Sequence, residues 1–298
     1  GQGASRPVLR GLGAERVQVL TNGIGVIDVS AASPDHQVAT DGIDAQKVEI
    51  LRGPAALVYG GQAIGGVVNV IDGLIMEDLP KRTFGGEAYA AGNSVNDGTE
   101  GGVRVQAVGG PLVLTLTASQ RNFDDYDFPG IAESDRLHAL EEAEEGEAHE
   151  EEAHSSGTLE NSFVDTQTYA GGLSWIGETA FLGLAVRRAE SQYGLPGSSH
   201  EHDEEEHEGE EHNEEALPFI DMEQTRYDLR GGISVDNGFL TNLTVSASQA
   251  DYTHTEFEGP GEPGTVFVSD GFEGRVEVGH VLGPVQGEFG IQRVAMLF

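Results

Sequence analysis

The chain has 298 residues, of which 16 are Lys or Arg and 51 are Asp or Glu, so its formal net charge is −35. Phosphate backbones attract cationic surfaces, so this charge argues strongly against a nucleic-acid partner and favours metal cations or simple solvation. The sequence has no cysteine, which excludes disulfides, thiolate metal sites and cysteine nucleophiles.

The chain has no run of eighteen or more apolar residues, so no transmembrane helix is predicted. Alternating strands give only weak hydropathy signals, so this observation does not exclude a transmembrane β-barrel. The chain starts at Gly1 without a basic and apolar leader, and it ends at Phe298 in a strand pattern. We therefore expect a fragment that is cut at both ends.

Residues 1–80 are predicted to form an α+β domain of short elements. Asn22-Gly23 is a tight-hairpin signal, and Pro54 suits the first position of a short helix. Strands are predicted at 16–20, 25–29, 48–51 and 67–71, and a short helix at 55–59.

From about Phe84 the pattern changes to longer strands in which apolar and small polar residues alternate. The clearest examples are residues 103–107, 112–118 and 243–247. One apolar face and one small polar face suit a strand between lipid and a wet lumen.

The connections between these strands alternate between short and long. The short ones lie at 109–111, 177–179, 236–238 and 283–284, and the long ones near 93–100, 125–165, 194–221 and 254–270. Outer-membrane barrels have short periplasmic turns and long outer loops, whereas a soluble β-sandwich with insertions does not explain this order. Residues 81–298 are therefore predicted to be the N-terminal part of an antiparallel transmembrane β-barrel, with about nine strands.

Four adjacent segments resemble the plug signature of TonB-dependent receptors. They are VEILRGP at 48–54, LVYG at 57–60, AIGG at 63–66 and VVNVI at 67–71. The glycine pairs alone would permit a phosphate loop, but no Gly-Lys-Ser/Thr follows them. The resemblance implies a plug inside a barrel of about 22 strands, in the outer membrane of a Gram-negative bacterium. It also implies that the TonB energy-transducing complex is a partner.

Seven of the ten histidines fall in two acidic runs that contain no Lys or Arg. They are His138, His149 and His154 in the first run, and His200, His202, His207 and His212 in the second. Imidazole and carboxylate together suit zinc, nickel or copper(II), so we expect these runs to capture transition metal weakly. The alternative is that they are merely disordered, solvated loops.

The segments SRPVLRG at 5–11 and SPDH at 33–36 resemble the zinc-uptake branch of the same receptors. The resemblance implies that Asp35 and His36 are zinc ligands in the plug, completed by side chains from the barrel. On its own, an Asp-His pair indicates a turn with a capping aspartate. The best barrel candidates are His254 and Glu256, which face the same side if their segment is extended; an ordinary polar strand end is the alternative.

These patterns favour import of zinc or a related divalent transition metal, as a transported ligand and not as a prosthetic group. Two alternatives are a receptor of this kind for a metal chelate or siderophore, and a passive porin or adhesin with metal-buffering loops. No enzyme motif is present, since the sequence lacks a nucleophile elbow, a zinc-protease helix motif and a dinucleotide fingerprint.

Overall fold

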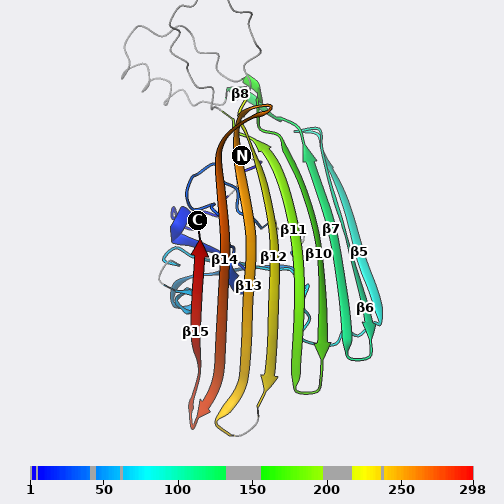
Figure 1. Cartoon of the computed structure of the whole chain (residues 1–298), viewed down its shortest axis with the longest axis vertical. Helices are drawn as coiled ribbons and strands as arrows, with labels where there is room; N and C mark the ends of the chain where they lie inside the picture. Colours follow the sequence, from blue (N-terminus) through cyan, green and yellow to red (C-terminus); the bar gives the residue numbers. More distant parts are fainter. Residues whose placement is uncertain are drawn as a thin grey trace, which may run out of the picture.

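A computed structural model describes the chain except for residues 1, 5, 41–44, 61–62, 132–155, 197–216, 236–237 and 298. The described part forms a four-stranded sheet, a nine-stranded sheet and a two-stranded hairpin. Figure 1 shows the long strands of the nine-stranded sheet side by side, with the N-terminal residues in blue against one of its faces. Among the described residues, no helix is long and apolar enough to cross a membrane.

The N-terminal unit, which comprises the residues before Phe84, contains the small sheet in the order β2-β1-β4-β3. Its elements are η1 (Ala14–Arg16), β1 (Val17–Thr21), β2 (Ile24–Gly25), β3 (Lys47–Leu51), η3 (Gly53–Tyr59) and β4 (Gly66–Ile71). β1 and β4 are parallel, and the other pairs are antiparallel. Asn22 and Gly23 both have positive φ, as the predicted tight hairpin requires. The predicted short helix is the 3-10 helix η3.

The nine-stranded sheet, called the wall below, runs in the order β15-β14-β13-β12-β11-β10-β7-β6-β5, and every neighbouring pair is antiparallel. Its strands are β5 (Phe84–Asn93), β6 (Gly98–Gly109), β7 (Leu112–Phe123), β10 (Val164–Ile176), β11 (Ala180–Gly194), β12 (Phe219–Ser234), β13 (Leu240–Gly259), β14 (Glu262–Leu282) and β15 (Val285–Leu297). The hairpin β8 (Tyr126–Ile131) and β9 (Ser156–Leu159) lies between β7 and β10 in sequence. The predicted antiparallel architecture is therefore confirmed.

Two predicted long connections, near 93–100 and near 254–270, are wrong. The first comprises only residues 94–97, because β5 ends at Asn93 and β6 begins at Gly98. β13 continues to Gly259 and β14 begins at Glu262, so only Pro260 and Gly261 separate the two strands. Gly261 has a φ of 84°, which lets so short a turn close. The consequence is that His254 lies within a long strand and not in a loop.

The two faces of the wall differ in polarity, as the alternation of β7 illustrates. Leu112, Leu114 and Leu116 are exposed, whereas Thr115 and Thr117 between and beside them are buried. A soluble sheet buries its apolar face, so this inversion suits a wall with lipid outside and polar contents inside.

The N-terminal unit packs against the polar face of the wall near β13 and β14 (Figure 1). The main-chain N–H of Gly25 donates to Glu273 Oε2 at 3.0 Å, and its carbonyl accepts from Arg226 Nη1 at 2.9 Å. Arg187 Nη2 contacts Asp72 Oδ2 at 3.2 Å, with both side chains buried. Burying a charge costs free energy of desolvation, and pairing with an opposite charge offsets part of that cost.

Candidate metal centre

Three of the predicted ligands converge on one point between the N-terminal unit and the wall. The ligand atoms of His36, His254 and Glu256, called the His–Glu cluster below, all lie within 4.8 Å of one another. His36 Nε2 is 2.9 Å and His254 Nε2 is 3.9 Å from Glu256 Oε1. The two imidazole centroids are 4.3 Å apart. The fold thus brings His36 to residues that are more than 200 positions away in sequence.

The loop that carries His36 is held from within by Asp28. The Asp28 carboxylate accepts hydrogen bonds from Ala39 N at 2.9 Å and from Ser30 Oγ at 2.7 Å, so it ties the two ends of the loop together. Burial raises the pKa of Asp28, and these hydrogen bonds oppose the shift. Arg6 adds hydrogen bonds to the carbonyls of Ser30 and Ser33.

The contacts of the His36 ring determine which of its nitrogens is free to bind a cation. Nδ1 lies 3.1 Å from the carbonyl oxygen of Val29, which can only accept, so Nδ1 carries a hydrogen. In a neutral ring Nε2 then presents its lone pair to Glu256 Oε1. Two acceptors that face each other repel, unless a proton or a metal cation lies between them.

His254 reaches the cluster from the inner face of β13. It is fully buried, and its Nε2 has no hydrogen-bond partner within the part of the chain that the structure describes. Nδ1 lies 3.0 Å from the hydroxyl of Tyr252, two residues earlier on the same face. Glu256 follows on that face and is 30% exposed, so it is the member of the cluster nearest to solvent.

Phe267 on β14 gives the cluster an apolar side. Its ring centroid lies 5.1 Å from that of His36 and 5.5 Å from that of His254. Val29, Met222 and Tyr252 belong to the apolar cluster against which Phe267 packs. Apolar side chains therefore line one side of the two imidazoles, and Glu256 is the one carboxylate that the described residues place in the His–Glu cluster.

The structure does not place Asp35 in the His–Glu cluster. The Asp35 carboxylate instead accepts a hydrogen bond from the hydroxyl of Ser33. Asp35 also lines a separate cavity of about 420 Å³ beside Leu159, Ser162 and Leu195. The other predicted ligands lie outside the described residues: His138, His149, His154, His200, His202, His207 and His212.

Sequence reasoning missed three residues that shape the centre, namely Tyr193, Tyr252 and Phe267. Tyr252 could have been found, because it lies on the same strand face as His254. Tyr193 and Phe267 approach from other strands, and nothing in their local sequence signals the contact.

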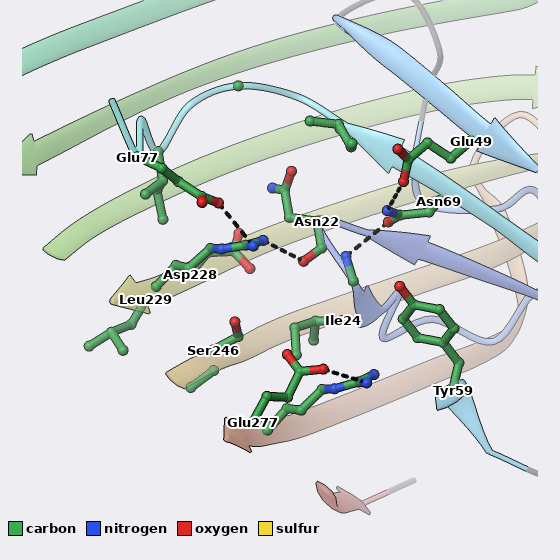
Figure 2. Close-up of a pocket in the computed structure, with 17 residues that line it drawn as sticks. Asn22, Ile24, Glu49, Tyr59, Asn69, Glu77, Asp228, Leu229, Ser246 and Glu277 are labelled. Carbon is green, nitrogen blue, oxygen red and sulfur yellow. Dashed lines mark hydrogen bonds and ion pairs between the residues drawn. The ribbon is translucent and has the colours of Figure 1, made fainter. Parts of the chain in front are cut away.

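A second cavity, of about 260 Å³, lies further along the wall and is shown in Figure 2. Ser246 lines it, eight residues before His254 on β13, which corresponds to roughly 27 Å of extended strand. Arg230 pairs with Glu77 at 2.9 Å, and Arg275 pairs with Glu277 at 2.6 Å.

The carboxylate of Glu49, which lines this second cavity, also accepts hydrogen bonds. Lys47 Nζ donates to it at 2.6 Å and Asn69 Nδ2 at 3.2 Å, and the hydrogen bond from Lys47, then that from Asn69, lowers the pKa of Glu49. Because these carboxylates already have partners, the second cavity is a poorer cation site than the His–Glu cluster.

The chain is similar to known outer-membrane receptors. Residues 1–67 match the TonB-dependent Receptor Plug Domain family. The chain is 32% identical over 100 residues to a vitamin B12 transporter of Photobacterium profundum, covering 33% of this chain and 14% of the relative. It is 30% identical over 133 residues to a vitamin B12 transporter of Vibrio cholerae serotype O1, covering 43% and 20%. The matched region thus spans a fifth or less of these relatives.

Solved structures share the fold over nearly the whole chain. A copper transporter, OprC, gives a TM-score of 0.67 at 15% identity, covering 99% of this chain and 40% of that one. A ferric enterobactin receptor mutant from Pseudomonas aeruginosa gives 0.66 at 15% identity, covering 95% and 41%. Residues 1–67 therefore carry a TonB-dependent receptor plug domain, and the antiparallel strands that follow share the fold of outer-membrane β-barrel receptors of Gram-negative bacteria.

Proposed function

We propose that this chain belongs to a receptor that imports zinc or a related divalent transition metal across the outer membrane. The observation that carries the proposal is the His–Glu cluster, in which a buried imidazole nitrogen of His254 has no hydrogen-bond partner in the described part of the chain. Buried polar atoms normally find partners, so an unpartnered nitrogen beside another imidazole and a carboxylate suits a cation.

The donor chemistry supports a transition metal over calcium or magnesium. Two imidazole nitrogens and one carboxylate oxygen form a set that zinc uses in proteins, and nickel and copper(II) accept the same donors. Calcium and magnesium prefer oxygen donors alone. Two donors on a tetrahedral zinc ion lie roughly 3.4 Å apart, so side-chain rotations are enough to bring all three within reach.

The remaining parts of the proposed import cycle rest on the plug and on the sequence. The two acidic, histidine-rich runs capture the ion outside, and the plug controls its passage. The TonB complex supplies the energy, as the plug match suggests. The same match favours this class over a passive porin or adhesin.

A metal chelate is the second candidate ligand. The relatives and similar structures include proteins named as vitamin B12 transporters and a ferric enterobactin receptor. Against it, His36 and His254 are almost completely buried, so a bulky chelate does not reach their nitrogens without rearrangement of the plug.

Titration calorimetry with zinc on the refolded full-length receptor tests the proposal. We expect His36→Ala to weaken binding by roughly a hundredfold, because it removes one of about four donors. His280→Ala is the matched control, since His280 is a wall histidine outside the His–Glu cluster and stacks on Phe289. Its effect should stay within about twofold, within the usual scatter of substitutions away from a site.

Equal and small effects from the two substitutions would contradict zinc binding at the cluster. Tight binding of intact cyanocobalamin or a ferric catecholate, unchanged by His36→Ala, would favour the chelate instead.

A further inference from the structure

Tyr193, on β11, holds the main chain on both sides of His36. Its hydroxyl oxygen accepts a hydrogen bond from Gln37 N at 2.9 Å, and its hydroxyl donates to the carbonyl of Asp35 at 3.1 Å. One wall side chain thus fixes the peptide before and the peptide after His36.

The ring of Tyr193 is itself held rigidly. It is fully buried and packs in an apolar cluster with Val164 and Ile220. Gly3 lies so close to the ring that an added Cβ would come within 2.7 Å of Tyr193 Cδ2. The hydroxyl position is therefore set by the packing of the ring, because a buried tyrosine has only two side-chain torsions to fix.

His36 is the one member of the His–Glu cluster that comes from the N-terminal unit. His254 and Glu256 lie on the same strand, two residues apart, so β13 alone fixes their relative placement. The direction of His36 depends instead on how its loop is tied to the wall. β11 lies two strands away from β13, so Tyr193 ties the loop from a second direction.

We propose that Tyr193 is a positioning residue that aims His36 Nε2 at Glu256 and His254; this inference rests on the proposed metal function. Removing the hydroxyl leaves the Gln37 N–H and the Asp35 carbonyl without that partner, and buried groups in this state are costly. The loop then relaxes, and His36 no longer meets the other two donors at a fixed distance.

The test uses Tyr193→Phe in the refolded full-length receptor, with cobalt(II) as a spectroscopic probe and zinc calorimetry beside it. We expect roughly tenfold weaker zinc binding, as for loss of a group that orients a ligand. We also expect an altered cobalt d–d spectrum, because the same donors then surround the ion in a different geometry. Tyr169→Phe is the control, since Tyr169 on β10 is 57% exposed on the outer face. It should leave the affinity and the spectrum unchanged.

A double-mutant cycle separates positioning from a general loss of stability. In the His36→Ala background, Tyr193→Phe should have no further effect on zinc affinity, because the ligand that it positions is gone. If Tyr193→Phe fails to refold, Ser191→Ala replaces it. Ser191 Oγ donates to Gln37 Oε1 at 2.9 Å, so we expect the same change with a smaller effect of about threefold.

The inference is overturned if Tyr193→Phe or its replacement keeps the wild-type affinity and spectrum while His36→Ala abolishes binding; the metal function then stands. It is overturned equally if the Tyr193→Phe effect persists in full without His36. If His36→Ala itself changes nothing, the proposed function fails, and the inference fails with it.

Discussion

The direction of each imidazole in the His–Glu cluster is set by the ring nitrogen that faces away from it. His36 Nδ1 donates to the Val29 carbonyl, and His254 Nδ1 lies beside the Tyr252 hydroxyl. Metal-binding histidines usually donate their second N–H to such a partner, which fixes the tautomer and the ring orientation. When His254 binds a cation through Nε2, its Nδ1 carries the hydrogen and donates to Tyr252.

This arrangement predicts that Tyr252→Phe weakens zinc binding while the receptor still folds. The substitution removes the oxygen that accepts from His254 Nδ1, so zinc binding should weaken by roughly tenfold. Calorimetry on the full-length receptor measures it. Tyr227→Phe is the control, because Tyr227 is 50% exposed on the outer face of β12. Indistinguishable affinities for the two variants would show that Tyr252 does not orient His254.

At the scale of elements, the N-terminal unit and the wall approach each other closely at two glycines of the wall. Gly172 on β10 and Gly183 on β11 face the segment that follows β4. A Cβ on Gly172 would come within 2.1 Å of the main-chain oxygen of Leu74. Two nearby contacts depend on this approach, namely Met76 N to Ser174 Oγ at 2.8 Å and Asp72 to Arg187.

Gly172→Ala should therefore weaken the packing of the N-terminal unit against the wall. Main-chain atoms yield less easily than side chains, and overpacking of this kind typically costs about 1–3 kcal/mol. We expect faster hydrogen exchange at residues 72–76 of the full-length receptor, with the wall strands unchanged. Gly85→Ala is the control, since a Cβ there meets nothing within 4 Å. Equal exchange in the two variants would contradict the role of this contact.

The elements could be predicted from the sequence more fully than the centre. Period-two alternation predicts the long strands and the shared face of His254 and Glu256, because both follow from local backbone geometry. The connection near 254–270 was mispredicted because polar residues continue the strand pairing there. The place of Tyr193 depends on tertiary packing between distant segments, which no local pattern encodes.

At the scale of the whole molecule, negative charge is distributed unevenly along the chain. Residues 138–154 contain eight glutamates and residues 200–215 contain ten acidic side chains, among 51 in the chain. Both runs lie outside the described residues. Their composition predicts that they raise the local concentration of cations, and under the proposed function the His–Glu cluster then binds the ion.

If the two runs only concentrate the ion, deleting 138–154 and 200–215 from the full-length receptor should slow the capture of zinc and leave the His–Glu cluster unaltered. Zinc uptake at low concentration should fall several-fold, because steering by charge raises association rates by about tenfold or more. At saturating zinc the uptake rate should match the wild type, and the cobalt spectrum should not change.

A second variant, in which the seven histidines of these runs become alanine and every carboxylate stays, separates imidazole capture from electrostatic attraction. If imidazoles matter, this variant should resemble the deletion at physiological salt, where exposed charges act over only about 8 Å. Failure of the deleted receptor to refold into a barrel would show that the runs are structural, and unchanged uptake at low zinc would remove their role in capture.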